Sequence, residues 1–110
     1  MSLELVPLCT ATVDDVASLS LGTTPVGRLL VGVAGRCRWE GDRLRASARQ
    51  VAEDWLTVSP DGSATVDARM VLEADDGALI AVRYRGRADM ASGAPPVFYV
   101  TPQFDTSDER

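Results

Sequence analysis

Charged side chains that alternate along two neighbouring segments are the residues of this chain best suited to chemistry. Asp67, Arg69 and Glu73 alternate along one segment, and Arg83 and Arg85 alternate along the next. Successive side chains of a β-strand point to opposite faces, so this spacing gathers all five on one face of a strand pair. Arginine binds carboxylates and other small anions through paired hydrogen bonds, and a carboxylate beside it could accept or donate a proton.

The turn between the two segments predicts how they pair. Asp75, Asp76 and Gly77 fit a three-residue loop, a type I turn followed by glycine in the left-handed position. A two-residue loop would pair Met70 with Arg83 and mix charges into an apolar face, so we prefer the longer loop. The predicted pairs are Ala74–Ala78, Leu72–Ile80, Met70–Val82 and Ala68–Tyr84 on an apolar face, and Glu73–Leu79, Val71–Ala81, Arg69–Arg83 and Asp67–Arg85 on a polar face.

The preceding turn, Pro60-Asp61-Gly62, extends this pair to a three-stranded meander, since proline presets its backbone angle and glycine accepts the left-handed position. The same loop rule pairs Val58 with Ala64 and Leu56 with Val66 on the apolar face, and Thr57 with Thr65 and Trp55 with Asp67 on the polar face. Six residues, called the polar row below, then share one face: Trp55, Asp67 and Arg85 in line across the strands, flanked by Arg69, Arg83 and Glu73.

Two interpretations of the polar row are open at this point. Charged strand faces are usually solvated, and each opposite-charge pair across a ladder contributes only about 0.2–1 kcal/mol. Alternatively, the sheet curls so that this face lines a cavity. An exposed Trp55 would be wasteful, and Arg69 directly opposite Arg83 is unfavourable unless an anion lies between them, so both observations favour a cavity.

Composition excludes several classes of function. The chain has 110 residues, a net charge of −5 and no histidine, and all eleven of its basic residues are arginine. Nucleic-acid binding needs a basic surface, which is missing here. Without histidine there is no Ser-His-Asp triad, no Cys-His pair and no three-histidine zinc site. Cys9 and Cys37 form no CxxC motif, so we expect two small core residues, no metal and no cofactor.

Short apolar runs separated by glycine-containing turns predict one all-β domain over residues 1–110, with a flexible tail at 105–110. A helix over 46–56 is the one helical alternative, and the β-rich Trp55–Val58 argues against it. Residues 49–54 are taken as a loop or bulge. The expected strands cover residues 3–13, 26–34 with 37–40, 44–49, 55–58, 64–74, 78–86 and 97–104, with loops at 21–25 and 88–96. We expect a small antiparallel β-barrel or strongly curled sheet, rich in meanders.

The residues after the N-terminus lack a charged stretch followed by a long apolar run. We therefore expect no signal peptide, no membrane span and a cytoplasmic location with reduced thiols.

Several motifs together resemble a known family, the small bacterial and fungal proteins of domain of unknown function 3237. The motifs are Leu3-Glu4-Leu5-Val6-Pro7-Leu8, Thr24-Pro25-Val26-Gly27-Arg28, Asp54-Trp55 before Pro60-Asp61-Gly62, Asp67-Ala68-Arg69, Asp75-Asp76-Gly77-Ala78-Leu79-Ile80, Arg83-Tyr84-Arg85-Gly86 and Tyr99-Val100-Thr101-Pro102-Gln103-Phe104-Asp105-Thr106. The resemblance spans nearly the whole chain and implies a β-barrel of uncertain activity.

The chain departs from the family pattern at two places. Residues 49–53 replace a Pro-Gly-Gly-Ala-type loop before Asp54-Trp55. Family members also continue past the equivalent of the C-terminal residue, through a Trp-Leu-Asn segment into further strands. A barrel without those strands exposes its edges, so we expect a partner chain, in a homodimer, to complete it.

Three functions are compatible with these features. The first is binding of a small anionic or aromatic metabolite, with Trp55 as a stacking plate, Arg69, Arg83 and Arg85 as carboxylate clamps, and Asp67 orienting Arg85. The second is a metal-independent isomerase, cyclase or lyase with Asp67 or Glu73 as base. The third is a dimerising interaction protein without a pocket. None of the three involves nucleic acid or a membrane.

Overall fold

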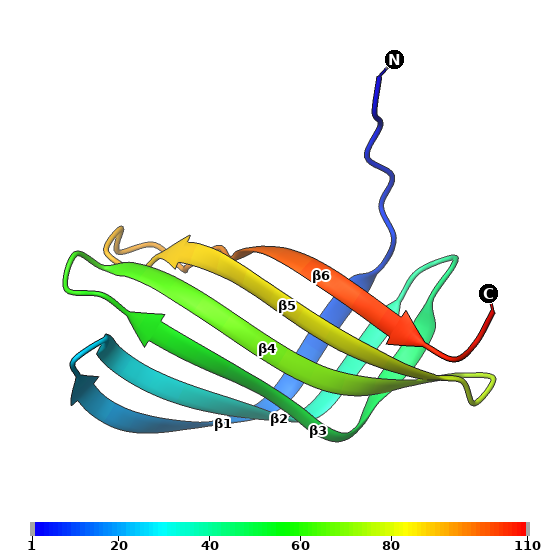
Figure 1. The fold of residues 1–110 in the computed structure, drawn as a ribbon, viewed down its shortest axis with the longest axis horizontal. Coiled ribbons are helices and arrows are strands. Elements are labelled where there is room, and N and C mark those ends of the chain that lie inside the picture. Colours follow the sequence, from blue (N-terminus) through cyan, green and yellow to red (C-terminus); the bar gives the residue numbers. More distant parts are fainter. Residues whose placement is uncertain (1, 110) are drawn as a thin grey trace.

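Six strands form one antiparallel sheet in the computed structural model, and their order in the sheet equals their order along the chain (Figure 1). The structure describes residues 2–109, except the side chains of residues 15, 16, 50 and 51. The strands are β1 (Thr10–Thr24), β2 (Gly27–Glu40), β3 (Arg45–Val58), β4 (Ser63–Ala74), β5 (Leu79–Asp89) and β6 (Tyr99–Thr106). The described residues contain no helix, and hence none long and apolar enough to cross a membrane.

The predicted register of the meander is confirmed. Every predicted pair between β3 and β4 is observed, including Trp55 with Asp67, and so is each predicted β4–β5 pair from Glu73–Leu79 to Asp67–Arg85. Ala78 lies in the turn outside β5, and there the N–H of Ala74 donates to the carbonyl of Ala78 at 2.8 Å. At the β4–β5 turn the N–H of Gly77 donates to the carbonyl of Ala74 at 2.8 Å, and Gly77 has a φ of 94°. That angle is one that glycine adopts without strain, which is why the turn determines the register.

The first strand is longer than predicted. The expected strand at 3–13 is correct only over residues 10–13, and the expected loop at 21–25 is wrong over residues 21–24, because β1 begins at Thr10 and continues to Thr24. Gly22, taken as a loop signal, lies instead at a register shift between β1 and β2, with a φ of 79°. A glycine inside a strand often marks such a bulge, and the flanking threonines favour extended backbone.

Residues 49–54 belong to the continuous strand β3, so the loop alternative is wrong and the bulge alternative is confirmed. Ala48 pairs with Leu72 and Ala52 pairs with Met70, so β3 uses four steps where β4 uses two. From Ala52 onward the side chains of β3 again alternate regularly between the inner and the outer face. Asp54 therefore points to the same side of the sheet as Ala52.

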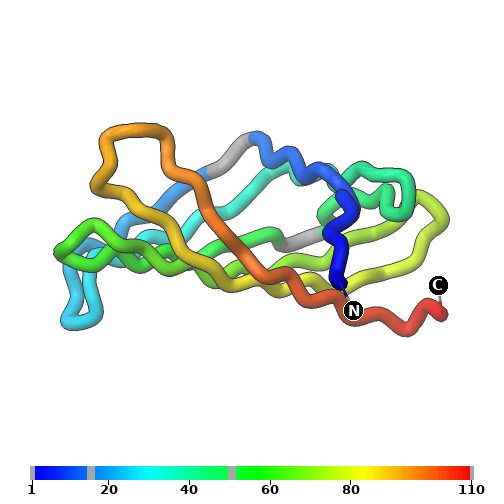
Figure 2. Tube along the Cα trace, turned by 90° about the horizontal axis from the view of Figure 1, so that it is seen from above, coloured from blue at the N-terminus to red at the C-terminus, as the bar shows by residue number. Residues whose placement is uncertain are grey.

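The sheet curls strongly, as predicted. Trp39 of β2 and Phe104 of β6 meet edge to face, with ring centroids 6.0 Å apart, although three strands separate β2 from β6 in the sheet. The curl encloses the apolar face, where Ala46, Ala68 and Leu72 are completely buried. Within the described residues β1 and β6 are unpaired edges, so the barrel is open there (Figure 2). Because β6 extends through Thr106, residues 105 and 106 belong to a strand and not to a tail.

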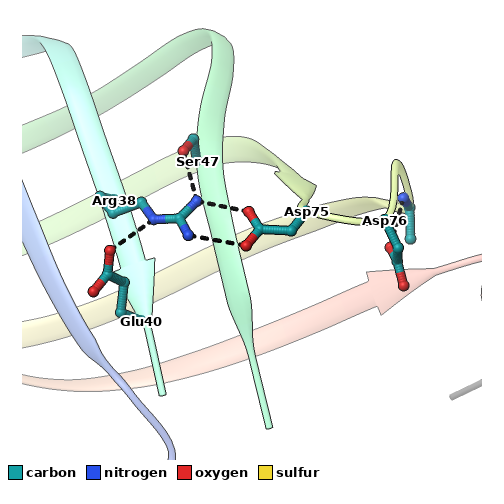
Figure 3. A network of polar contacts seen from close by, with 6 residues as sticks. Arg38, Glu40, Ser47, Asp75 and Asp76 are labelled. Atoms are coloured by element: carbon teal, nitrogen blue, oxygen red, sulfur yellow. Dashed lines mark hydrogen bonds and ion pairs between the residues drawn. The ribbon is translucent and has the colours of Figure 1, made fainter. Parts of the chain in front are cut away.

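An arginine network ties together one end of the curled sheet. Arg38 of β2 donates to Glu40 at 2.9 Å, to Ser47 of β3 at 3.0 Å, and through two bonds of 2.9 and 3.2 Å to Asp75 in the β4–β5 turn (Figure 3). Asp76 points elsewhere and accepts the N–H of Ala78. The network lies on the outer, exposed face, and these charges therefore hold strand ends together without entering the interior.

Candidate functional site

The polar row lies on the outer face of the sheet. Trp55 is 45% exposed, and the side chain of Arg85 is 73% exposed. The curl encloses the opposite face, so the polar row does not line the interior. A groove of about 760 Å³ passes over Arg69 and Arg83, but long exposed side chains form much of it. The roles in binding or catalysis that we predicted for these residues stay predictions. They apply to an open surface and not to an enclosed cavity.

Each carboxylate of the polar row has an arginine beside it. Glu73 accepts a hydrogen bond from Arg49 at 2.8 Å. Asp67 Oδ2 lies 3.7 Å from Arg85 Nε, while its Oδ1 is covered and has no hydrogen-bond partner among the described residues. Both carboxylates therefore already have a positively charged neighbour on the open outer face.

The inner face holds a hollow of about 430 Å³, the feature of the molecule best suited to a ligand. Its walls come from both edges of the sheet, with Val13 of β1 on one side and Val100 of β6 on the other. We call it the inner hollow. The side chains that line it are Leu8, Cys9, Ala11, Val13, Cys37, Trp39, Asp54, Val66, Met70, Tyr84, Phe98, Val100, Pro102 and Phe104.

Asp54 and Tyr84 are brought together in this hollow by the register of the sheet. Gly32, Asp54, Ala68 and Tyr84 pair successively across β2, β3, β4 and β5. Asp54 and Tyr84 are two strands apart, roughly 10 Å between their Cα atoms by ordinary strand spacing. Only the methyl group of Ala68 stands between them, so the register leaves room for the phenol ring to lean toward the carboxylate.

Asp54 and Tyr84 are both partly buried, and this partial burial is the largest influence on the pKa of each. It raises the pKa of Asp54, against the lowering effect of hydrogen bonds from the backbone N–H groups of Gly32 and of Asp54 itself. Burial also raises the pKa of Tyr84, and the nearby charge of Asp54 adds to the rise. The phenol therefore stays protonated and can donate a hydrogen bond. Among the described residues no arginine forms an ion pair with Asp54.

Two thiols complete the polar atoms of the hollow. The indole N–H of Trp39 donates to Cys37 Sγ at 3.1 Å, and the Cys37 thiol lies 4.0 Å from Met70 Sδ. Burial raises the pKa of both Cys37 and Cys9, so both stay protonated thiols at neutral pH. Cys37 is a buried core residue, as predicted, and Cys9 packs against the same core. In the described part of the chain no three His, Cys, Asp or Glu side chains cluster as metal ligands.

Sequence reasoning missed Asp54, although a signal for it exists. Asp54 alternates with Leu56 and Val58, which were placed on the apolar face. A carboxylate at a core-facing position breaks the pattern and indicates function or strain. Treating residues 49–54 as a loop or bulge left Asp54 without a face. The sequence correctly predicted that Tyr84 lies on the apolar face, but Tyr84 was not among the predicted site residues.

The raised pKa of Asp54 predicts that Asp54→Asn stabilises the protein at neutral pH. A carboxyl group whose pKa is higher in the folded state favours folding fully below its unfolded pKa, near 3.9, and loses that contribution as the pH rises through its folded value. The gain should thus be present at pH 7 and absent at about pH 3.5. Thermal unfolding of the variant and the parent at both pH values measures it.

Asp67→Asn on the outer face is the matched control, because it removes the same charge from a chain of net charge −5. Equal gains in the two variants would show that overall charge, and not burial at Asp54, is responsible.

Comparison with known proteins supports the fold and names no activity. A family model described as protein of unknown function (DUF3237) matches residues 3–110. No curated protein is significantly similar in sequence.

Three crystal structures have a similar fold. A protein of unknown function from Clostridium acetobutylicum has a TM-score of 0.81 and 22% identity, over 92% of this chain and 77% of its own. A conserved protein of unknown function from Rhodopseudomonas palustris has a TM-score of 0.73 and 19% identity, over 94% and 80%. A beta-barrel like protein from Acinetobacter baumannii has a TM-score of 0.74 and 26% identity, over 98% and 82%.

Proposed function

Since the chain belongs to the DUF3237 family, whose description names no activity, we propose from the geometry that it binds a small, mainly apolar organic molecule in the inner hollow. Ligand sites are concave, mostly apolar, and about 300–1,000 Å³ in volume, with a few polar groups that fix orientation. The inner hollow, at about 430 Å³, fits this description. Curled sheets of this size can hold one small ligand.

The observation that carries the proposal is Asp54. A carboxylate facing an apolar interior without a cationic partner is unfavourable for folding. Sequences retain such groups where function requires them, and ionisable groups whose pKa is shifted by burial cluster at functional sites. Val66, Met70 and Phe104 around the hollow offer apolar contact, while Asp54 and Tyr84 offer the polar contacts.

The inner hollow is a better ligand site than the outer groove. A ligand in the hollow would contact both edges of the sheet, and its apolar surface would be removed from water, which favours binding. On the outer face, ordering exposed arginines such as Arg69 and Arg83 would cost side-chain entropy before any affinity is gained. The proposed ligand is therefore mainly apolar, in place of the anionic metabolite expected on the polar row.

Acid–base catalysis is a second candidate function, favoured by the raised pKa of Asp54. A carboxyl group works best as a general acid or base when its pKa approaches the working pH. In this alternative Asp54 replaces Asp67 and Glu73 as the base of a metal-independent isomerase or lyase. Tyr84, held protonated, would donate a hydrogen bond to a carbonyl oxygen of the substrate.

Dimerisation and a cytoplasmic location stay proposals. The edges β1 and β6 are unpaired within the described residues, and unpaired edges are sites where another strand can add. Size-exclusion chromatography with light scattering would give the mass in solution. A dimer would support the proposal that a partner chain completes the barrel, and a monomer would contradict it.

A pair of tryptophan variants tests the proposed ligand site. Val100→Trp places a large side chain in the hollow from the edge strand β6, whereas Tyr99→Trp changes the neighbouring residue, which is 78% exposed and does not line the hollow. The parent is first screened against ring compounds by thermal shift, since a ligand at 100 times its Kd adds about 2.7 kcal/mol of stability.

We expect the shift to be lost in Val100→Trp and kept in Tyr99→Trp. A ligand whose shift survives Val100→Trp and disappears in Arg85→Ala would place binding on the polar row and refute the inner hollow.

A further inference from the structure

The inner hollow is acidic, and its charge has no counterpart inside. Asp54 is its one carboxylate, and no arginine lines it in the part of the chain that the structure describes. The chain contains no lysine or histidine. Strand alternation places three arginines on the outer face: Arg69 is adjacent to the inward-facing Ala68, and Arg83 and Arg85 flank the inward-facing Tyr84. The positive charges of the meander thus lie on the other side of the sheet.

The carboxylate of Asp54 has acceptor capacity to spare. An ionised carboxylate has about four lone-pair sites. Hydrogen bonding from the backbone N–H groups of Gly32 and Asp54 lowers its pKa and takes up part of this capacity. The other polar hydrogens of the hollow are limited, since the indole N–H of Trp39 is directed to Cys37. The phenol of Tyr84 could fill one further acceptor site, and the sites that remain on Asp54 can accept a donor from a ligand.

We propose that the inner hollow selects ligands whose polar group is a hydrogen-bond donor, a protonated amine or a hydroxyl on an apolar ring skeleton, and rejects carboxylates. This inference rests on the proposed function and adds the ligand's polarity to it. An ammonium group would satisfy and neutralise Asp54 at once. A carboxylate in the same place would lie beside a like charge in a poorly solvated site, with only Tyr84 to donate to it.

A matched ligand series separates polarity from shape. The probes are 2-naphthylmethylamine, 2-naphthalenemethanol and 2-naphthoate, which share one ring system, titrated by calorimetry at pH 8 and low salt. In the parent we expect the amine to bind at least about tenfold more tightly than the naphthoate, with the alcohol between them. Asp54→Asn should remove most of this ratio.

Asp67→Asn is the matched control, because it removes the same charge from the outer face, where Asp67 lies beside Arg85. The ratio should be unchanged in this variant. Equal loss in both variants would show that the net charge of the chain is responsible, and it would overturn the inference. Naphthoate binding as tight as the amine, abolished by Val100→Trp, would also overturn the inference while the proposed function stood. If no probe and no compound of the wider screen bound the parent, the proposed function itself would fail.

Discussion

We expect Leu72→Ala to lower the free energy of unfolding by about 2–5 kcal/mol, the range measured for leucine-to-alanine changes in well-packed cores. Among the side chains that the structure describes, Leu72 is the largest that is completely buried, and it belongs to the cluster that includes Trp39 and Val82. Domains of this size are stable by only about 5–15 kcal/mol, so the loss would be a large part of the total. Urea denaturation of the variant and the parent measures the difference.

Val71→Ala is the control for this prediction. Val71 is adjacent in β4, faces outward and is 38% exposed. We expect it to change the free energy of unfolding by about 0.5 kcal/mol or less, as surface substitutions usually do. Similar losses at the two positions would contradict the assignment of the apolar face to the interior.

Gly86→Ala should detach β6 from β5 around Tyr99 and Val100. Gly86 pairs with Val100, and a Cβ atom added to it would overlap the carbonyl oxygen of Tyr99 and the side chain of Val100. A backbone atom cannot rotate away as a side chain can, so the edge strand has to move. Overpacking of this kind costs about 1–3 kcal/mol.

The effect of Gly86→Ala should be local and should reach the inner hollow, where we propose that a ligand binds. We expect faster amide hydrogen exchange in β6 with little change in β3 and β4, because strands at an edge open independently of the core. Val100, Pro102 and Phe104 form one wall of the inner hollow, so affinity for any ligand of the hollow should fall as well. Arg85→Ala, at the neighbouring outward-facing residue, should leave both properties unchanged. Uniform acceleration of exchange throughout the sheet would contradict this view.

The meander could be predicted from local chemistry alone. Residues 60–62 and 75–77 each end in a glycine that adopts a positive φ, and a tight turn leaves its flanking strands only one register that keeps charges off the apolar face. For this reason β3, β4 and β5 pair in the predicted register. The all-β class followed from the same alternation of apolar and polar residues, together with the family motifs.

Residues remote from any tight turn were predicted less well. The end of the first strand depends on pairing with β2, which lets Gly22 lie in a bulge and not in a loop. Between Ala48 and Ala52, β3 uses two more steps than β4, and this bulge interrupts the regular pairing shortly before Asp54. A bulge is a property of two strands together, so one segment cannot reveal it.

The sequence by itself determined the strands of the meander, their register and the contents of each face. Only the tertiary structure decided which face is enclosed. The contact between Trp39 and Phe104, far apart in the sheet, shows that the apolar face is inside. Burying that face removes the greater apolar area from water, and this outweighs any gain from enclosing the charges of the polar row. The site that we propose therefore lies at Asp54 and Tyr84 on the enclosed face, and not at the charged residues that are conspicuous in the sequence.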